Sequence, residues 1–125
     1  VGPYKDGVYY AQESEFVSGW KYMTHIAVKN GTIVAADWNG IPEEKGALDK
    51  DNLSKSGEYG LVAKGGAQAE WHEQAQRAEA YLLKTQDPTK ITYNDEKGHT
   101  DDIAGVSIHV IEFFKLAEEA LKDAK

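Results

Sequence analysis

The sequence contains no cysteine. This absence excludes disulfides, thiolate zinc sites, iron–sulfur clusters and cysteine nucleophiles together. It does not decide the compartment, because many secreted proteins also lack cysteine. The chain also has no apolar run long enough to span a membrane, and it shows no signal peptide. Because the chain starts at Val1 rather than Met, we expect it to be a piece of a longer protein.

An excess of positive charge is also missing. The chain has 14 Lys and Arg against 21 Asp and Glu, for a formal net charge of -7. An acidic surface repels phosphate backbones and anionic membranes, so we expect no nucleic-acid partner. With 41% hydrophobic and 28% charged residues, the composition is typical of a globular protein. A length of 125 residues fits a single domain over residues 1–125.

The first third of the chain predicts β-structure. Residues 8–11 form a short β-rich run, and residues 20–28 alternate between two sets of side chains with a period of two. Asn30-Gly31 follows, and this pair favours a two-residue hairpin turn because both positions need positive φ. Residues 33–38 then form the predicted returning strand.

Residues 39–66 are polar and rich in glycine, and we expect little regular structure there. A loop of this length inside a small domain is usually functional or mobile. Apolar and aromatic side chains punctuate it, so we expect it to pack against the core.

Two helices are predicted in the second half of the chain. One covers residues 68–86, and the other runs from about residue 109 to residue 124. A short strand at residues 91–93 is predicted between them. Strands first and helices later favour an α+β fold: a small antiparallel sheet (the N-terminal hairpin), two helices packed on one face, and the long glycine-rich loop. The first helix has its apolar stripe at Trp71, Ala75, Ala78 and Leu82, and places Glu70, Glu73, Gln74 and Arg77 largely elsewhere.

The histidines do not show a metal-binding pattern, and we expect no metal. His25, His72 and His99 fit surface or hydrogen-bonded positions better. His109 stays open, because it lies two residues after Ser107 and a Ser–His pair is a feature of hydrolases. Residues at this spacing do not face each other on a helix, however, and no Gly-x-Ser-x-Gly motif surrounds the serine.

The segment before the last helix allows two interpretations. Ser107 is either a helix N-cap or an exposed hydroxyl near a helix N-terminus, where a phosphate group is favoured. Gly105 either gives the backbone freedom or lets another molecule approach closely. Asp101 and Asp102 fit solvated acids near a helix start.

Three stretches carry a resemblance to a known family. "DGVYYA", "GWKYMTHIAVKNGTIVAADWNG" and "TDDIAGVSIHVIEFFKLAEEAL" resemble the FMN-binding domain family. Within it, they are most similar to the flavinylated lipoproteins that Gram-positive bacteria use for extracellular electron transfer. The similarity covers nearly the whole chain.

The resemblance implies a covalent cofactor. In that family a flavin transferase esterifies the FMN phosphate onto a threonine or serine hydroxyl. The acceptor segment places its acid on Asp101, its small residue on Ala104, its glycine on Gly105 and its hydroxyl on Ser107. Val106 replaces the usual alanine, and a bulkier β-branched side chain there could hinder the transferase.

The resemblance therefore implies an extracytoplasmic, lipid-anchored electron carrier at the cell surface. Its expected partners are the flavin transferase, a membrane electron donor and an extracellular electron acceptor, and it would not be an enzyme. Trp38, Tyr59 and Trp71 are the residues that we expect near the flavin ring. The alternative is a non-redox extracellular module that binds a small ligand or a partner protein through residues 39–66.

Overall fold

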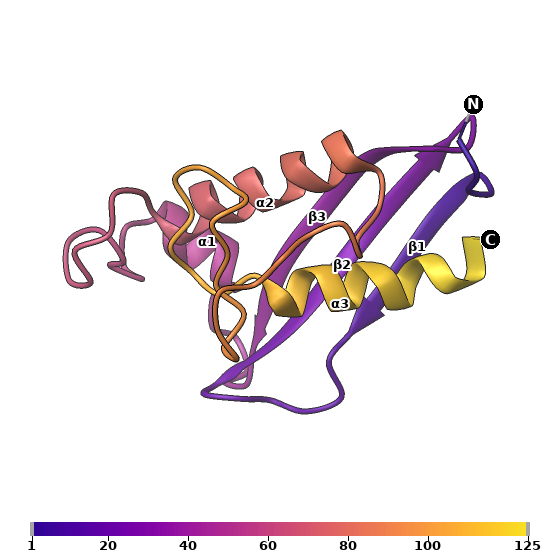
Figure 1. Ribbon diagram of the computed structural model, residues 1–125. Coiled ribbons are helices and arrows are strands. Elements are labelled where there is room, and N and C mark those ends of the chain that lie inside the picture. Colours follow the sequence, from indigo (N-terminus) through magenta and orange to yellow (C-terminus); the bar gives the residue numbers. More distant parts are fainter. Residues whose placement is uncertain (1, 125) are drawn as a thin grey trace.

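The computed structural model describes residues 2–124, which form a three-stranded sheet with helices on one side (Figure 1). No helix in this range is both long and apolar enough to cross a membrane. In chain order the elements are β1 (Gly7–Gln12), β2 (Trp20–Lys29), β3 (Thr32–Pro42), α1 (Lys50–Lys55), α2 (Trp71–Thr85) and α3 (Ile111–Ala120), with a short 3-10 helix at Leu121–Ala124.

The predicted hairpin is confirmed. β1, β2 and β3 are antiparallel neighbours in that order, and the turn between β2 and β3 is Asn30-Gly31. Asn30 has φ of 54° and Gly31 has φ of 77°, as this type of turn requires. A Cβ added at Gly31 would lie 2.1 Å from the carbonyl oxygen of Gly2, so the turn also packs against the N-terminal segment.

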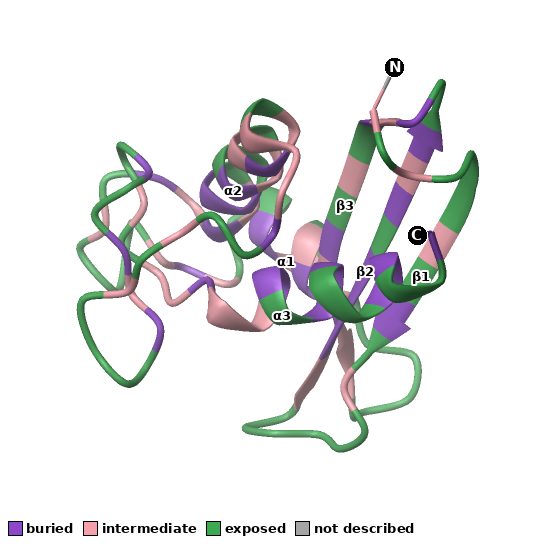
Figure 2. Ribbon diagram, turned by 45° about the vertical axis from the view of Figure 1, so that its right-hand side comes forward, coloured by how far each residue is buried: buried purple, intermediate pink, exposed green. Residues whose placement is uncertain are grey.

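Helices α2 and α3 cover one face of the sheet, and the predicted α+β fold is confirmed (Figures 1 and 2). α2 packs on β3, whereas α3 packs on β2 and β1. The alternation within β2 explains the choice of face, because its buried side chains point to the helices. They include Tyr22, Thr24, Ile26 and Val28.

The ends of α2 are defined by side-chain hydrogen bonds. Glu70 and Glu73 form a capping box at its start. At its end, Gln86 adopts a left-handed conformation with φ of 63°. The Gln86 amide also accepts from the Ile33 N–H at 2.7 Å and donates to the Ile33 carbonyl at 3.0 Å. These bonds attach the end of α2 to β3.

The prediction of a strand at residues 91–93 is wrong. This segment is an irregular stretch whose backbone bonds to side chains instead of to the sheet. The Asp102 carboxylate accepts from the Thr92 N–H at 2.8 Å, and the Thr100 hydroxyl donates to the Thr92 carbonyl at 2.6 Å. Because these bonds satisfy both backbone groups of Thr92, no partner strand is needed.

The expectation of little regular structure in residues 39–66 is partly wrong. β3 continues into this range, and α1 lies in its middle. Asp49 caps α1 by accepting from the Asn52 N–H at 2.9 Å. Residues 56–70 form turns without helix or strand, and they extend away from the sheet in Figure 1.

Candidate functional site

Ser107 lies in the irregular segment that leads into α3. Its side chain is exposed, and α3 begins only at Ile111 with Val110 as its N-cap. The interpretation of Ser107 as a helix cap is therefore wrong. The α3 N-terminus, which we expected to favour a phosphate at Ser107, also lies further along the chain, because the first helical residue is Ile111.

Gln74 of α2 holds this segment in place. The side chain is 1% exposed, and its Oε1 atom accepts from the N–H groups of Ser107 at 2.7 Å and Ile108 at 3.1 Å. Its Nε2 atom donates to the Ala69 carbonyl at 3.0 Å. Helical periodicity placed Gln74 largely off the buried face. The structure buries it, because two backbone donors from a distant segment need an acceptor.

Gly105 gives the backbone the freedom that its sequence position allowed, and the group that approaches it comes from the same chain. It has φ of 75°, and its carbonyl accepts from Arg77 Nη1 at 2.6 Å. A Cβ at this position would lie 2.6 Å from the same nitrogen. The group that approaches the glycine backbone is thus the guanidinium of Arg77, which is exposed on α2.

An open pocket of about 580 Å³ lies beside this segment. Gly105, Val106, Ser107 and Ile108 line one part of it together with Gln74, and the rest comes from Leu61 and residues 65–68.

Of the remaining residues of the predicted acceptor segment, Val106 lines this pocket, whereas Ala104 and Asp101 do not. Val106 is half-buried and packs against the core. Ala104 is exposed, and so is Asp101, which accepts a long hydrogen bond of 3.4 Å from the Asn94 amide. The sequence motif therefore brings Gly105, Val106 and Ser107 to the pocket, but not its acid.

Trp38 and Trp71 were expected near the flavin ring, but the structure buries both side chains in the core. Trp38 is 0% and Trp71 2% exposed, and their ring centroids lie 5.1 Å apart in the core. Packing between the helices and the sheet buries both rings, so neither offers a face to a ligand. Trp38 Nε1 is the one buried side-chain nitrogen or oxygen in residues 2–124 without a hydrogen-bond partner.

Tyr59 is half-buried and lines a second pocket of about 400 Å³. Lys50, at the start of α1, also lines it, and burial lowers the pKa of this lysine to about 8. Lys50 donates to the hydroxyl of Tyr22. Burial raises the pKa of this hydroxyl above that of an ordinary tyrosine. Trp20 completes the aromatic lining, and the polar wall includes Glu13, His109 and Glu112.

His109 is paired with Glu112 and not with Ser107. Its Nδ1 atom lies 2.8 Å from Glu112 Oε1, and this hydrogen bond raises the pKa of the imidazole. His109 and Ser107 line different pockets. The geometry therefore gives no support to a Ser–His hydrolase pair.

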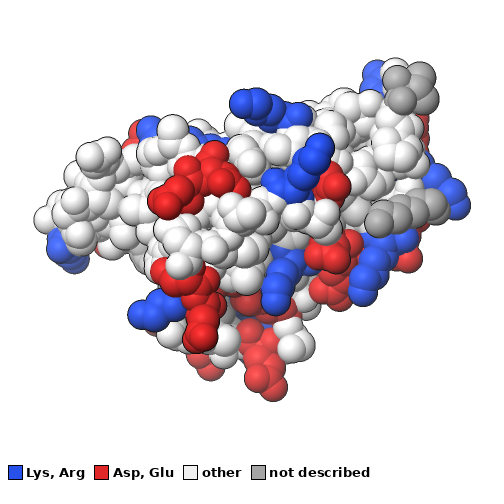
Figure 3. Space-filling model, in the orientation of Figure 1, with Lys and Arg blue, Asp and Glu red and all other residues white. Residues whose placement is uncertain are grey.

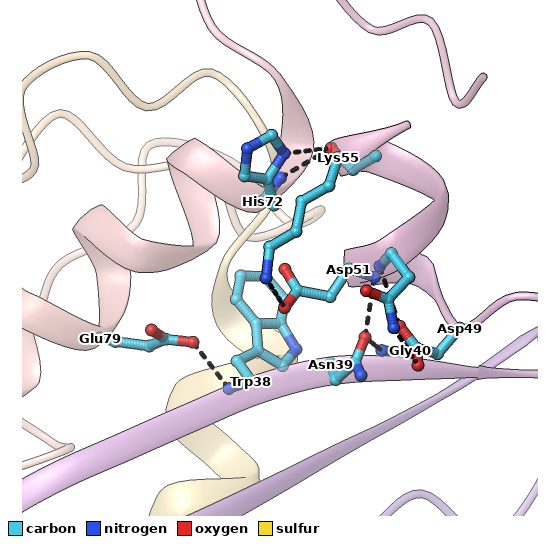
Figure 4. Close-up of polar contacts among 10 residues, drawn as sticks. Trp38, Asn39, Gly40, Asp49, Asp51, Lys55, His72 and Glu79 are labelled. Atoms are coloured by element: carbon cyan, nitrogen blue, oxygen red, sulfur yellow. Dashed lines mark hydrogen bonds and ion pairs between the residues drawn. The ribbon is translucent and has the colours of Figure 1, made fainter. Parts of the chain in front are cut away.

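A third polar cluster joins α1, α2 and β3 (Figure 4). Glu79 accepts from the Trp38 N–H at 2.8 Å, and its burial raises the pKa of the carboxyl to about 7. Asp51 and Lys55 form an ion pair within α1, with 3.4 Å between nitrogen and oxygen. His72 bonds to α1 as well, at the hydroxyl of Ser54, which is buried. Because its hydrogen bonds and ion pair join residues of α1, α2 and β3, we interpret this cluster as structural.

The comparisons with known proteins identify two similar structures. The solution structure of a Clostridium thermocellum protein is 57% identical, with a TM-score of 0.71, and the match covers 95% of this chain and 91% of that chain. This chain belongs to the same family as that protein. The crystal structure of a Clostridium perfringens protein has a TM-score of 0.70 at 26% identity, covering 97% of this chain and 88% of that chain.

No family model matches the chain, and no curated protein matches it. The resemblance to the FMN-binding domain family therefore stays a prediction. Within residues 2–124 no group of three or more histidine and carboxylate side chains could hold a metal ion.

Sequence reasoning missed Gln74 and Lys50, which line the two pockets, and Arg77, which contacts Gly105. Gln74 and Arg77 looked like ordinary surface positions of a helix, and Lys50 lay inside a predicted loop. Arg77 and Lys50 are cations, which are natural partners of a phosphate site, but nothing in the sequence places either one beside the acceptor segment. The positions of all three residues depend on contacts between distant segments.

Proposed function

We propose that this protein is a flavin carrier in which Ser107 holds FMN through a phosphoester bond, and that the domain relays electrons in extracellular electron transfer. The observation that carries this proposal is the exposed Ser107 hydroxyl at the edge of an open pocket, beside Gly105 and Arg77. The proposal follows from the sequence resemblance and is supported by this geometry.

The residues around Ser107 fit a phosphate ester. Within residues 2–124 the hydroxyl has one polar contact, a long one of 3.4 Å to Gln74 Oε1, so its oxygen is free to react. The Arg77 guanidinium lies next to the same segment and has donors beyond the one used by the Gly105 carbonyl. Arg77 thus supplies the positive charge that we expected from the α3 N-terminus.

Attachment requires an outside catalyst. The Ser107 oxygen forms a bond to the flavin phosphorus, the phosphoanhydride bond of a flavin dinucleotide breaks, and the hydroxyl proton leaves with the departing nucleotide. Within residues 2–124, no base contacts the Ser107 hydroxyl, so a flavin transferase would have to supply it. Once bound, FMN supplies the electron-transfer chemistry. The chain itself would hold the flavin and would not act as an enzyme.

The cellular setting of the proposal comes from the resemblance. We expect a cell-surface protein with a lipid anchor outside this sequence, a membrane electron donor and an extracellular electron acceptor. These partners would exchange electrons with an exposed edge of the flavin, without substrate chemistry by the protein.

Intact mass after co-expression with a flavin transferase tests the attachment. The wild-type protein should turn yellow and gain the mass of one FMN less one water. Ser107→Ala should gain nothing, whereas Ser107→Thr should keep the modification because it keeps the hydroxyl. Ser14→Ala, at another exposed serine, is the matched control and should behave like the wild type. A modified Ser107→Ala protein would contradict the proposal.

The alternative is a non-redox binding module, and one observation favours it. A pocket of about 600 Å³ is lined by the segment after β3, and Leu48 beside it is 48% exposed. Titration with free FMN, followed by fluorescence quenching, separates the two functions. No binding and no covalent modification in any state would favour the binding module.

A further inference from the structure

Lys50 is a buried lysine surrounded by aromatic rings. It is 4% exposed although it opens a short helix at the surface of the fold. Its Nζ atom lies between 4.7 and 5.5 Å from the centroids of four rings, those of Trp20, Tyr22, Tyr59 and Trp71. Such contacts stabilise a cation, but they leave its hydrogen-bond donors unused.

The ammonium group of Lys50 has spare donors. It can donate three hydrogen bonds, and the one found within residues 2–124 goes to the Tyr22 hydroxyl. No carboxylate in this range lies within ion-pair distance of it. The two carboxylates that line the pocket have other contacts: Glu13 accepts from the Tyr22 N–H at 2.8 Å, and Glu112 bonds to His109. A buried charge without a partner is costly, so an acceptor from outside the chain fits here.

The pocket beside Lys50 has room for such an acceptor. Its volume of about 400 Å³ falls in the range of small-molecule sites. Gly40 of β3 leaves room for the lysine, since a Cβ there would lie 3.0 Å from Lys50 Cβ and 3.3 Å from the ring of Trp20. The half-buried rings of Trp20 and Tyr59 remain available to a planar ligand.

The walls of this pocket and of the Ser107 pocket include consecutive residues of the chain. Ile108 lines the Ser107 pocket and His109 lines the Lys50 pocket. Likewise, Leu61 lines the Ser107 pocket and Tyr59 lines the Lys50 pocket. Two residues of chain span at most about 7 Å. A flavin tethered at Ser107 would therefore have to extend past His109 toward Lys50.

We infer that the Lys50 pocket receives the carbonyl-bearing edge of the flavin ring, with the Lys50 ammonium donating to a ring oxygen and Trp20 and Tyr59 contacting the ring. The inference rests on the flavin carrier function proposed above, and it names the residue that tunes the flavin. A positive charge beside the ring favours the reduced form, which carries more negative charge. Lys50 therefore raises the reduction potential.

The test compares Lys50→Met with Lys55→Met, a matched lysine on the same helix that is exposed. Riboflavin, which lacks the phosphate, is titrated into protein made without the transferase. The wild type and Lys55→Met should quench its fluorescence saturably, whereas Lys50→Met should bind about tenfold more weakly because one charged hydrogen bond is lost. In transferase-treated protein, Lys50→Met should have a lower reduction potential than the wild type.

The outcomes separate the inference from the function on which it rests. A flavin attached at Ser107, by mass, whose potential is unchanged in Lys50→Met overturns the inference and leaves the carrier function intact. Lys50-dependent riboflavin binding without attachment supports the inference and contradicts the tether. Absence of saturable riboflavin binding by the wild type overturns the inference.

Circular dichroism and thermal unfolding would reveal a folding defect in Lys50→Met. A second variant tests the pocket independently of that lysine. Tyr59→Leu removes a half-buried ring from the pocket and leaves the lysine in place. Weaker riboflavin binding by Tyr59→Leu supports the inference, and binding equal to that of the wild type overturns it.

Discussion

At the scale of the residue, position 105 shows how backbone conformation and a neighbour jointly demand glycine. The left-handed φ of 75° disfavours any side chain, and the Arg77 guanidinium occupies the space that a Cβ would take. The motif in the sequence already marked this glycine. Only the fold identifies the neighbour, because Arg77 belongs to α2, which is distant in the sequence.

Gly105→Ala should therefore destabilise the protein by about 2 kcal/mol, from backbone strain and from displacement of Arg77. Gly66→Ala is the control, since Gly66 has a similar φ of 71° but open space around it. Strain alone should cost that variant about 1 kcal/mol. Urea unfolding measures both, and equal losses would show that the Arg77 contact contributes nothing.

At the scale of the element, Gln74 connects α2 to the segment that carries Ser107. The connection is a buried amide that accepts from two consecutive backbone N–H groups. Helix periodicity finds the apolar stripe at Ala75 and Ala78 correctly, but it does not identify a polar residue that is buried by a partner segment. The wrong strand at residues 91–93 has a similar cause, because side-chain bonds from distant residues replaced the sheet.

Gln74→Leu should leave the N–H groups of Ser107 and Ile108 without an acceptor and cost about 2 kcal/mol of stability. Amide hydrogen exchange should become faster at these two positions while the centre of α2 stays protected. Gln76→Leu, an exposed glutamine on the same helix, should leave the exchange at both amides unchanged. Unchanged exchange in Gln74→Leu would show that the amide does not hold the segment.

At the scale of the whole molecule, the acidic composition and a buried carboxyl both shape stability. Acidic and basic side chains are interspersed on the face in Figure 3, and the net charge is -7. Glu79 is different from the surface acids, because burial, together with the nearby charges of Asp37 and Asp51, raises its pKa from 4.5 to about 7. The folded state therefore binds its proton more tightly than the unfolded state does.

The contribution of Glu79 to stability should be complete below pH about 4.5 and lost as the pH rises through about 7. Glu79→Gln keeps an acceptor for the Trp38 N–H but cannot ionise, so its stability should fall less over this interval. The difference between the two proteins should change by at most about 3 kcal/mol from pH 4.5 to pH 8. Chemical unfolding at several pH values measures it, and parallel curves would contradict the raised pKa.

The sequence by itself determined the local and periodic features of this protein. Alternation in β2, the Asn30-Gly31 turn and the stripes of α2 and α3 need only neighbours in the chain, so the α+β class followed from them. The exposed hydroxyl at Ser107 was also one of the alternatives that the sequence allowed.

Only the tertiary structure decided which side chains surround that hydroxyl. It buried the rings of Trp38 and Trp71, brought Gln74 and Arg77 to the acceptor segment, and enclosed Lys50 among aromatic rings. These contacts join residues that are far apart in the chain. Burial and hydrogen bonding between such segments depend on how the helices pack on the sheet, and no local pattern encodes that packing residue by residue.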